Sequence, residues 1–272
     1  MSIQKAAKAS LAALLVGGLM AMLPAPSSVA RADDTKAAPG VGNDAIVALN
    51  RMSKTLQAKQ FSFVARTFRA YAGPNGELLH IAHTIKTVVN RPDKIAVDVT
   101  GDDGSSQLLF DGKNLVAYIV AAKKYASTPV AGDIDKALDV AEERAGIDFP
   151  LADLLANDPG ESMLAGVTSG GQVGTATIDG VACRHYFFVQ ASDDLEWELW
   201  LEDNDRATPR RVVVTYRALP GRPIFFAALS DWNFSAQTAA SDFEFKPPPG
   251  VTQVQFVTKS STAASTPPAA QK

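Results

Sequence analysis

The residues with the greatest chemical reactivity in this chain are few and far apart. The three histidines are His80, His83 and His185. His80 and His83 lie three residues apart in a segment with strand character, so their side chains leave on opposite faces. Two metal ligands on one strand would instead need a spacing of two residues. The sequence therefore predicts isolated strand histidines and no metal site.

Motifs for nucleophilic catalysis and phosphate binding are incomplete. Residues 167–171 read Val-Thr-Ser-Gly-Gly, which lacks the first glycine of a Gly-x-Ser-x-Gly nucleophile elbow. The glycines here do not stand between a strand and a helix, so they fit neither a P-loop nor a dinucleotide fingerprint. Adjacent aspartates at 102–103 and 193–194 lie in turn-like segments, and turn chemistry explains them better than acid–base catalysis. We therefore predict that the protein is not an enzyme and holds no cofactor.

The first 32 residues predict export from the cytoplasm. Lys5 and Lys8 precede an apolar run at 11–20, and Ala30-Arg31-Ala32 places small residues at the two positions that a signal peptidase reads. The predicted cleavage point precedes Asp33. The alternative, an uncleaved anchor, is disfavoured because a spanning helix needs about 20 apolar residues. We expect a periplasmic protein that does not span the membrane.

Composition restricts the class of the mature protein. The leader carries three of the 26 basic residues and none of the 29 acidic ones, which leaves a formal net charge of −6. This charge argues against nucleic acid and anionic membrane surfaces as partners. Cys183 is the only cysteine, so no internal disulfide can form, and its apolar surroundings predict a buried thiol rather than a reactive one. Stability must come from an ordinary apolar core.

The chain has no internal linker and no detectable repeat, which predicts one domain at 43–257. Residues 33–42 and 258–272 are polar and small, and we expect a flexible N-terminal segment and a disordered tail because such residues bury little apolar surface.

Apolar periodicity predicts an α+β protein that is mainly antiparallel β. A helix is expected at 43–59, where apolar residues recur at helical spacing. Short turns separate the strand-like runs, and turns of two to four residues can join only antiparallel strands. Two further helices are predicted at 133–145 and 150–157, the second ending before Pro159. The predicted strands are 61–72, 78–90, 94–100, 107–110, 115–121, 174–179, 181–190, 195–202, 210–218 and 224–234, with a last interrupted piece at 243–257.

The run 195–202 predicts a sheet with one dry face. Leucines and Trp197 alternate with glutamates, so one side of the strand is apolar and the other is polar apart from Trp200. A dry face must be covered, and the predicted helices at 133–145 and 150–157 are few and short for so many strands. We therefore expect room on this face for an apolar guest. An exposed Trp200 among glutamates would in turn indicate a contact with another protein.

Three segments in order resemble the LolA-like superfamily of periplasmic proteins, which includes the lipoprotein carrier LolA, LppX and the N-terminal domain of the stress sensor RseB. Residues 90–94 read Asn-Arg-Pro-Asp-Lys, like the Lys-Arg-Pro element of that superfamily. Residues 107–118 resemble its strand, Asp-Gly-Lys turn and strand, and residues 243–251 resemble its C-terminal Phe-x-Phe-x-Pro-Pro-x-Gly-Val motif. The match is closer still to a group of predicted periplasmic proteins of unknown function.

This resemblance implies an unclosed β-barrel with helices covering its concave, apolar face. In the carrier, the cavity takes lipoprotein acyl chains and an arginine of the Lys-Arg-Pro element holds the helical lid shut by hydrogen bonds. Arg91 is the matching residue here, although it can also be read as an ordinary turn residue before Pro92. The ligand-binding residues predicted on this basis are Arg91, Leu109, Tyr118, Leu154, Trp197 and Leu199.

Two functions are consistent with the sequence. The first is a carrier or binding protein for a lipid, a lipoprotein acyl chain or another apolar ligand. The second is an RseB-like sensing or interaction module that meets another envelope protein through a sheet edge or an acidic face.

Overall fold

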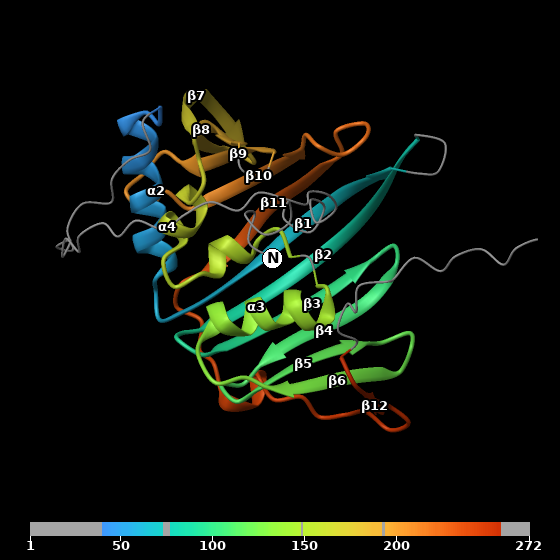
Figure 1. The fold of residues 1–272 in the computed structure, drawn as a ribbon. Coiled ribbons are helices and arrows are strands. Elements are labelled where there is room, and N and C mark those ends of the chain that lie inside the picture. The colour runs from blue at the N-terminus through green and yellow to red at the C-terminus, as the bar shows by residue number, and fades with distance from the viewer. Residues whose placement is uncertain (1–39, 73–76, 148, 192–193, 257–272) are drawn as a thin grey trace, which may run out of the picture.

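The computed structural model describes residues 40–72, 77–147, 149–191 and 194–256 (Figure 1). The predicted leader and the predicted tail at 258–272 lie outside these residues, as does most of the predicted flexible segment at 33–42.

A single sheet of twelve strands forms the framework, in the order β12-β6-β5-β4-β3-β2-β1-β11-β10-β9-β8-β7. Every neighbouring pair is antiparallel except β12 and β6, which are parallel. The order is linear and leaves β12 and β7 as edges, so the sheet is not closed into a barrel. The predicted fold class, an unclosed antiparallel sheet with helices on its concave face, is confirmed (Figure 1).

The strand bounds agree with most of the predicted runs. They are β1 Gln60–Ala72, β2 Leu78–Asn90, β3 Lys94–Gly101, β4 Gly104–Phe110, β5 Asn114–Ile119, β6 Lys124–Pro129, β7 Ser169–Ile178, β8 Val181–Gln190, β9 Leu195–Glu202, β10 Pro209–Tyr216, β11 Ile224–Asn233 and β12 Thr252–Val254. β6 was not predicted, because its sequence Lys-Tyr-Ala-Ser-Thr-Pro lacks aliphatic alternation. It becomes a strand by pairing with β5 across a hairpin.

Local turn chemistry explains the tight connection between β4 and β5. The Oδ1 atom of Asp111 accepts hydrogen bonds from the backbone N–H groups of Lys113 (2.8 Å) and Asn114 (2.7 Å). Gly112 has φ +92°, a conformation that side-chain-bearing residues rarely adopt. The predicted Asp-Gly-Lys-Asn turn therefore forms through its own side chain and glycine.

Short helical segments lie on the concave face of the sheet (Figure 1). They are α2 Asn43–Leu56, α3 Ile134–Ala145, the 3-10 turn η2 Ala152–Leu155 and α4 Pro159–Leu164, which together we call the helical cover. A further 3-10 turn, η4 Ala240–Asp242, follows β11. α3 is capped as its sequence predicts: the Asp133 side chain accepts from Lys136 N–H, and Gly146 takes the left-handed conformation after its last residue.

The predicted helix at 150–157 is wrong in extent. Only Ala152–Leu155 is helical, and Pro159 begins a helix rather than following one. Asp158 is the N-cap of α4, accepting from Glu161 N–H at 3.0 Å, and proline fits the first helical position because its missing N–H is not needed there.

The main core lies between the concave face and the helical cover. Alternate residues of most strands point into it, so that in β9 Leu195, Trp197, Leu199 and Leu201 are buried there, as predicted. Trp197 is fully buried and stacks on Phe188 with ring centroids 3.9 Å apart.

The C-terminal segment covers part of the opposite, outer face. Phe243 and Phe245 pack there against Ala96 and Leu109, and β12 then pairs with the edge of β6. The prediction of strand structure for 243–257 is therefore wrong apart from Thr252–Val254. The segment is held by apolar packing rather than by a strand ladder.

Trp200 is buried, which corrects the prediction that it is exposed. Its side chain is 9% exposed, and its ring stacks on His185 with centroids 3.9 Å apart. The guanidinium of Arg211 also lies over the Trp200 ring, 5.2 Å from its centroid. Neighbouring strands supply these partners, so the alternation within β9 alone could not reveal them.

We predict that Phe243→Ala lowers the free energy of unfolding by about 3 kcal/mol, because the phenyl group is 1% exposed and its loss leaves a cavity on the outer face. Urea denaturation followed by circular dichroism measures this change. The adjacent Glu244 is exposed, so Glu244→Ala should change stability by less than about 0.5 kcal/mol. Equal effects of the two substitutions would show that the segment is not packed as described.

Candidate ligand-binding site

Arg91 joins the helical cover to the sheet. It directly follows β2, and its Nε and Nη2 atoms donate hydrogen bonds to the Leu56 carbonyl oxygen at 3.1 and 3.0 Å. Its Nη1 atom donates to the Leu155 carbonyl oxygen at 3.0 Å. Leu56 ends α2 and Leu155 ends η2. One guanidinium therefore binds the carbonyl ends of two helical segments, where acceptors lack partners within the helix.

The surroundings of Arg91 are partly apolar. The guanidinium lies 5.8 Å from the ring centroid of Phe61, which is fully buried. Burial lowers the pKa of Arg91 from its ordinary value, and the nearby Asp135 carboxylate opposes this shift. A guanidinium keeps its proton in proteins, so the hydrogen bonds to the two carbonyl groups are charge-assisted.

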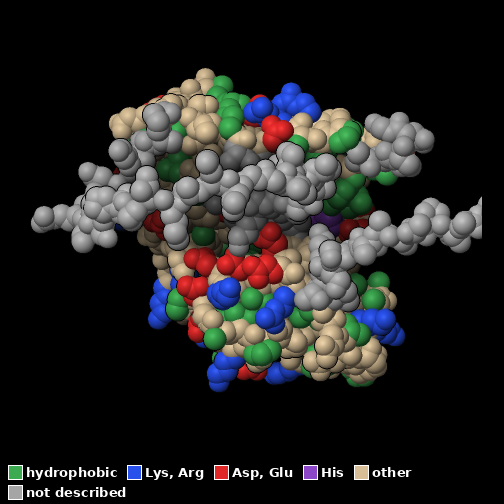
Figure 2. Space-filling view, viewed as in Figure 1, with side chains coloured by type: hydrophobic (Ala, Val, Ile, Leu, Met, Phe, Trp, Pro, Cys, Tyr) green, Lys and Arg blue, Asp and Glu red, His purple; other side chains and the backbone are tan. Residues whose placement is uncertain are grey.

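Asp135 is placed by the loop that precedes α4. It accepts a hydrogen bond from Asn157 N–H at 3.0 Å, and the Asn157 side chain donates to Asp133 at 2.6 Å. Burial raises the pKa of the Asp135 carboxyl above its ordinary value, and the hydrogen bond from Asn157 and the charge of Arg91 limit the rise. Acidic side chains of α3 gather on the face of the molecule seen in Figure 2.

A separate contact joins α2 to α4. The Ser53 hydroxyl donates to the Asp158 carboxylate at 2.7 Å. Gly160 lies so close that an added Cβ would stand 3.1 Å from the Ser53 Cβ. Sequence reasoning did not find these contacts, although the Asp-Pro pair at 158–159 signals a helix start and could have placed α4.

The structure separates the predicted ligand-binding residues into two groups. On the concave side, Arg91 binds the helical cover, and Leu154 of η2 is buried in the main core together with Trp197 and Leu199 of β9. Leu109 and Tyr118 lie on the outer face, where Leu109 packs on Phe243 and Tyr118 packs on Phe245.

The pleat of β4 explains why Leu109 lies on the outer face. In β4 the neighbours Leu108 and Phe110 point into the main core, so Leu109 must point outward. Three consecutive apolar residues at 108–110 hide this alternation in the sequence. A role in ligand binding stays a prediction for every member of the set.

The concave face of the sheet continues beyond the helical cover and carries exposed apolar residues there. The β1–β2 hairpin extends past the helices (Figure 1), and its inward positions there include Tyr71 and Leu79, which are cross-strand partners. Tyr71 is 43% exposed and Leu79 is 54% exposed. Both share the face of the buried Ala65 and Ile85. The cross-strand pairs Thr67–His83 and Arg69–Ile81 lie between, so Tyr71 and Leu79 form a separate exposed apolar strip near the end of the hairpin.

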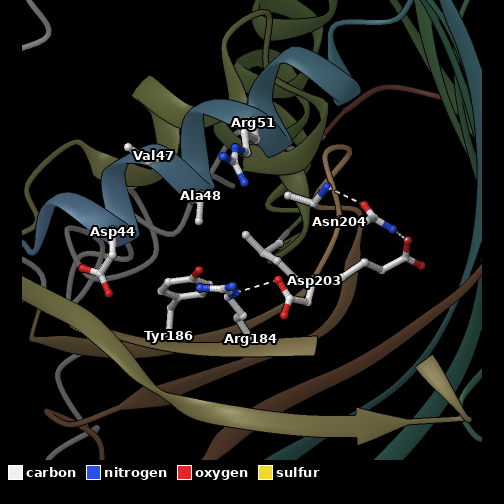
Figure 3. Close-up of a pocket in the computed structure, with 11 residues that line it drawn as sticks. Asp44, Val47, Ala48, Arg51, Arg184, Tyr186, Asp203 and Asn204 are labelled. Atoms are coloured by element: carbon white, nitrogen blue, oxygen red, sulfur yellow. Dashed lines mark hydrogen bonds and ion pairs between the residues drawn. The ribbon is translucent and has the colours of Figure 1, made fainter. Parts of the chain in front are cut away.

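A small pocket of about 260 Å³ opens between α2 and the strands β8 and β9 (Figure 3). Its floor is apolar, with Ala48 and Leu201 among its lining residues. Arg184 points across it and is held by Asp203 at 2.7 Å, a hydrogen bond that raises the pKa of Arg184. Burial raises the pKa of the Tyr186 phenol, and α2 adds Asp44 and Arg51 at the rim. Charges of both signs line the pocket, so it favours neither anions nor cations.

The described residues contain neither a cluster of metal ligands nor a membrane-spanning helix. No group of three or more histidine, cysteine, aspartate or glutamate side chains is close enough to hold a metal ion. No helix in the same residues has the length and apolar character needed to cross a membrane.

We predict that Arg91→Lys lowers the free energy of unfolding by about 2 kcal/mol, because an ammonium group cannot reach both carbonyl oxygens and leaves one without a partner. Hydrogen exchange should show faster exchange in α2 and η2 than in β1 and β11. The matched control is Arg222→Lys, since Arg222 is 59% exposed in its contact with Glu196 and should change stability by less than about 0.5 kcal/mol.

The raised pKa of Asp135 predicts a pH-dependent effect of Asp135→Asn. The folded protein holds this proton more tightly than the unfolded chain, so the ionised carboxylate costs stability once the pH rises through the folded-state pKa. Asparagine resembles the protonated acid in shape. The variant should match the wild type at pH 3, below the ordinary value of 3.8, and be more stable at pH 7 by less than about 1 kcal/mol, because the group is half exposed to screening solvent. Thermal melts at the two pH values, with the exposed Asp205→Asn as control, measure this difference.

Comparisons with solved structures show similar folds at low sequence identity. The Mycobacterium tuberculosis lipoprotein LppX is 15% identical, with a TM-score of 0.42 over 72% of this chain and 99% of that chain. A LolA superfamily protein from Nitrosomonas europaea is 10% identical, with a TM-score of 0.37 over 73% of this chain and 97% of that chain. MucB in the Pseudomonas aeruginosa MucA/MucB complex is 16% identical, with a TM-score of 0.39 over 75% of this chain and 61% of that chain.

Comparison with curated proteins found no match. A family model described as "Predicted periplasmic protein (DUF2092)" matches residues 45–257, which is most of the chain. The chain therefore belongs to the DUF2092 family of predicted periplasmic proteins, in agreement with the localisation predicted from its sequence.

Proposed function

We propose that this protein binds a lipid or another apolar molecule on the concave face of its sheet. Two observations carry the proposal: the dry core under the helical cover, and an exposed apolar strip formed by Tyr71 and Leu79 further along the same face. An acyl chain placed along the hairpin would remove apolar surface from water at about 25 cal/mol per Å². The exposed strip is therefore the first contact for a ligand.

Deeper binding requires the helical cover to move. Trp197, Leu199 and Leu154 are at most 2% exposed, so a ligand reaches them only when α2 and η2 separate from the sheet. The hydrogen bonds of Arg91 hold both segments at their carbonyl ends. Arg91 thus acts as a positioning residue that sets the cost of opening, and each buried CH₂ of the ligand returns about 0.8 kcal/mol.

A second function, contact with another envelope protein, is supported by a different feature. Burial of Trp200 removes the support that its predicted exposure gave. In the described part of the chain, the edge of β7 at 172–178 has no paired strand, and this is an independent observation in favour of such contact.

The ligand-binding proposal predicts saturable binding of a defined fatty-acid probe, cis-parinaric acid, to the purified protein. Leu79→Lys should weaken binding at least fivefold, because the ammonium group interrupts the apolar strip. Val173→Lys is the matched control: Val173 is 59% exposed on β7, far from the strip in the strand order, and its replacement should leave probe affinity unchanged. Probe fluorescence titration measures both.

Two further measurements decide the proposal. Mass spectrometry of an organic extract from protein purified out of the periplasm should detect a stoichiometric apolar molecule. Added probe at 100 times its dissociation constant should stabilise the folded state by about 2.7 kcal/mol. An empty extract together with an unchanged melting temperature in the presence of the probe would contradict ligand binding.

A further inference from the structure

The two edges of the open sheet differ in their backbone pairing. At one edge, β6 is paired by the short strand β12. At the other edge, β7 pairs with β8 on one side, and on its other side only its first residues contact another described segment. An edge strand presents a row of backbone N–H and C=O groups that can pair with another strand. The exposed edge of β7 is therefore a place where an additional strand could form.

β7 lacks most of the features that protect an edge strand. Its ten residues, Ser169–Ile178, contain no charged residue and no proline. Its one irregularity is a register shift between Gln172 and Gly174, beside the exposed Val173. Natural edge strands are usually blocked by lysine, proline or a covering segment. An uncharged edge of this length therefore indicates a place where another strand binds.

The beginning of this edge already accepts an extended segment of the same chain. Gly42 N–H donates to the Gly170 carbonyl oxygen at 2.9 Å, and Gly170 N–H donates to the Gly40 carbonyl oxygen at 3.1 Å. Val41 forms a parallel bridge with Gly170. The chain then enters α2 at Asn43, so within the described residues the edge at 172–178 has no backbone partner.

We propose that residues 172–178 of β7 bind an extended segment of another protein as an added strand. The side chains on the two faces of β7 define the chemistry of that segment. Gln172, Thr175 and Thr177 lie on the concave side, because their partners in β8 share the face of Tyr186. Polar residues of the added strand belong on this side.

On the outer side of β7, the added strand would carry large apolar residues. Gly171 and Gly174 lie there, and a Cβ built on either residue has no atom within 4 Å. A bulky side chain on the added strand would cover this bare backbone, as aromatic residues do beside glycines in sheets. The partner is thus an extended peptide that alternates polar and bulky apolar residues.

A second copy of the chain fits this edge less well. Two paired β7 strands would place glycine and alanine beside glycine and leave the backbone uncovered on the outer side. Each mature chain also carries a formal charge of −6, which opposes self-association at low ionic strength. The proposed surface differs from the concave face and does not depend on ligand binding there.

The test uses a fluorescent probe peptide with the core sequence Thr-Phe-Thr-Val-Thr-Phe-Thr flanked by serines. We expect saturable binding to the full mature protein by fluorescence anisotropy. A control peptide with N-methyl groups on alternate backbone nitrogens keeps the side chains but cannot complete the ladder, so its affinity should be at least tenfold lower.

Val173→Lys should also weaken binding of the probe peptide at least tenfold, because a charged side chain on the edge opposes strand addition. Leu79→Lys is the matched control: it makes the same change at an exposed apolar position of β2 and should leave peptide affinity unchanged. The fatty-acid measurement and the peptide measurement therefore respond to opposite variants, and failure of one does not imply failure of the other.

Hydrogen exchange on the wild-type protein gives a readout that needs no variant. Backbone amides within 172–178 that point away from β8 should exchange more slowly when the probe peptide is present. Equal affinity for the N-methylated peptide, or binding without protection in β7, would overturn the proposal. A concentration-dependent dimer in analytical ultracentrifugation that Val173→Lys abolishes would also overturn it, by showing that a second copy occupies the edge.

Discussion

The structure depends on covering one apolar face of an open sheet with very few helical residues. Most of the strands contribute inward side chains to the main core, and in the described part of the chain α2, α3, η2 and α4 lie over them. Burying the apolar side chains stabilises the assembly, but the ends of short helices leave carbonyl groups that need partners. Arg91 supplies them at two helical ends at once. Arg91 therefore adds directional hydrogen bonds to the apolar packing that holds the cover on the sheet.

The outer face shows a second solution to the same constraint. Near β3 and β4 it is covered by the C-terminal segment, through Phe243 and Phe245, without regular secondary structure. On β9 and its neighbours, the outer face is closed by its own side chains, where Trp200 lies between His185 and Arg211. Among the described residues, the end of the β1–β2 hairpin carries the exposed Tyr71 and Leu79, and the edge of β7 at 172–178 has no paired strand. They offer side-chain surface in one case and backbone hydrogen bonds in the other.

Prediction from sequence succeeded where a local pattern is sufficient. The alternation in β9 assigns Trp197 and Leu199 to the core, and the Asp-Gly-Lys-Asn turn forms as its residues require. The predicted exposure of Trp200 was wrong, because His185 and Arg211 on the two neighbouring strands cover its ring. The packing of Leu109 on Phe243 could not be foreseen, since the three consecutive apolar residues at 108–110 show no alternation and Phe243 is far away in the sequence.

The sequence by itself determined the periplasmic localisation, the antiparallel pairing of successive long strands and the dry face of β9. The last two follow from turn residues and periodicity, which act over a few neighbouring positions. Only the tertiary structure decided which face Leu109 and Tyr118 occupy, which carbonyl groups Arg91 binds and which sheet edge is left uncovered. These features depend on contacts between segments tens to more than a hundred residues apart. Such contacts follow from how the whole sheet curls and how the helical cover and the C-terminal segment fill its two faces.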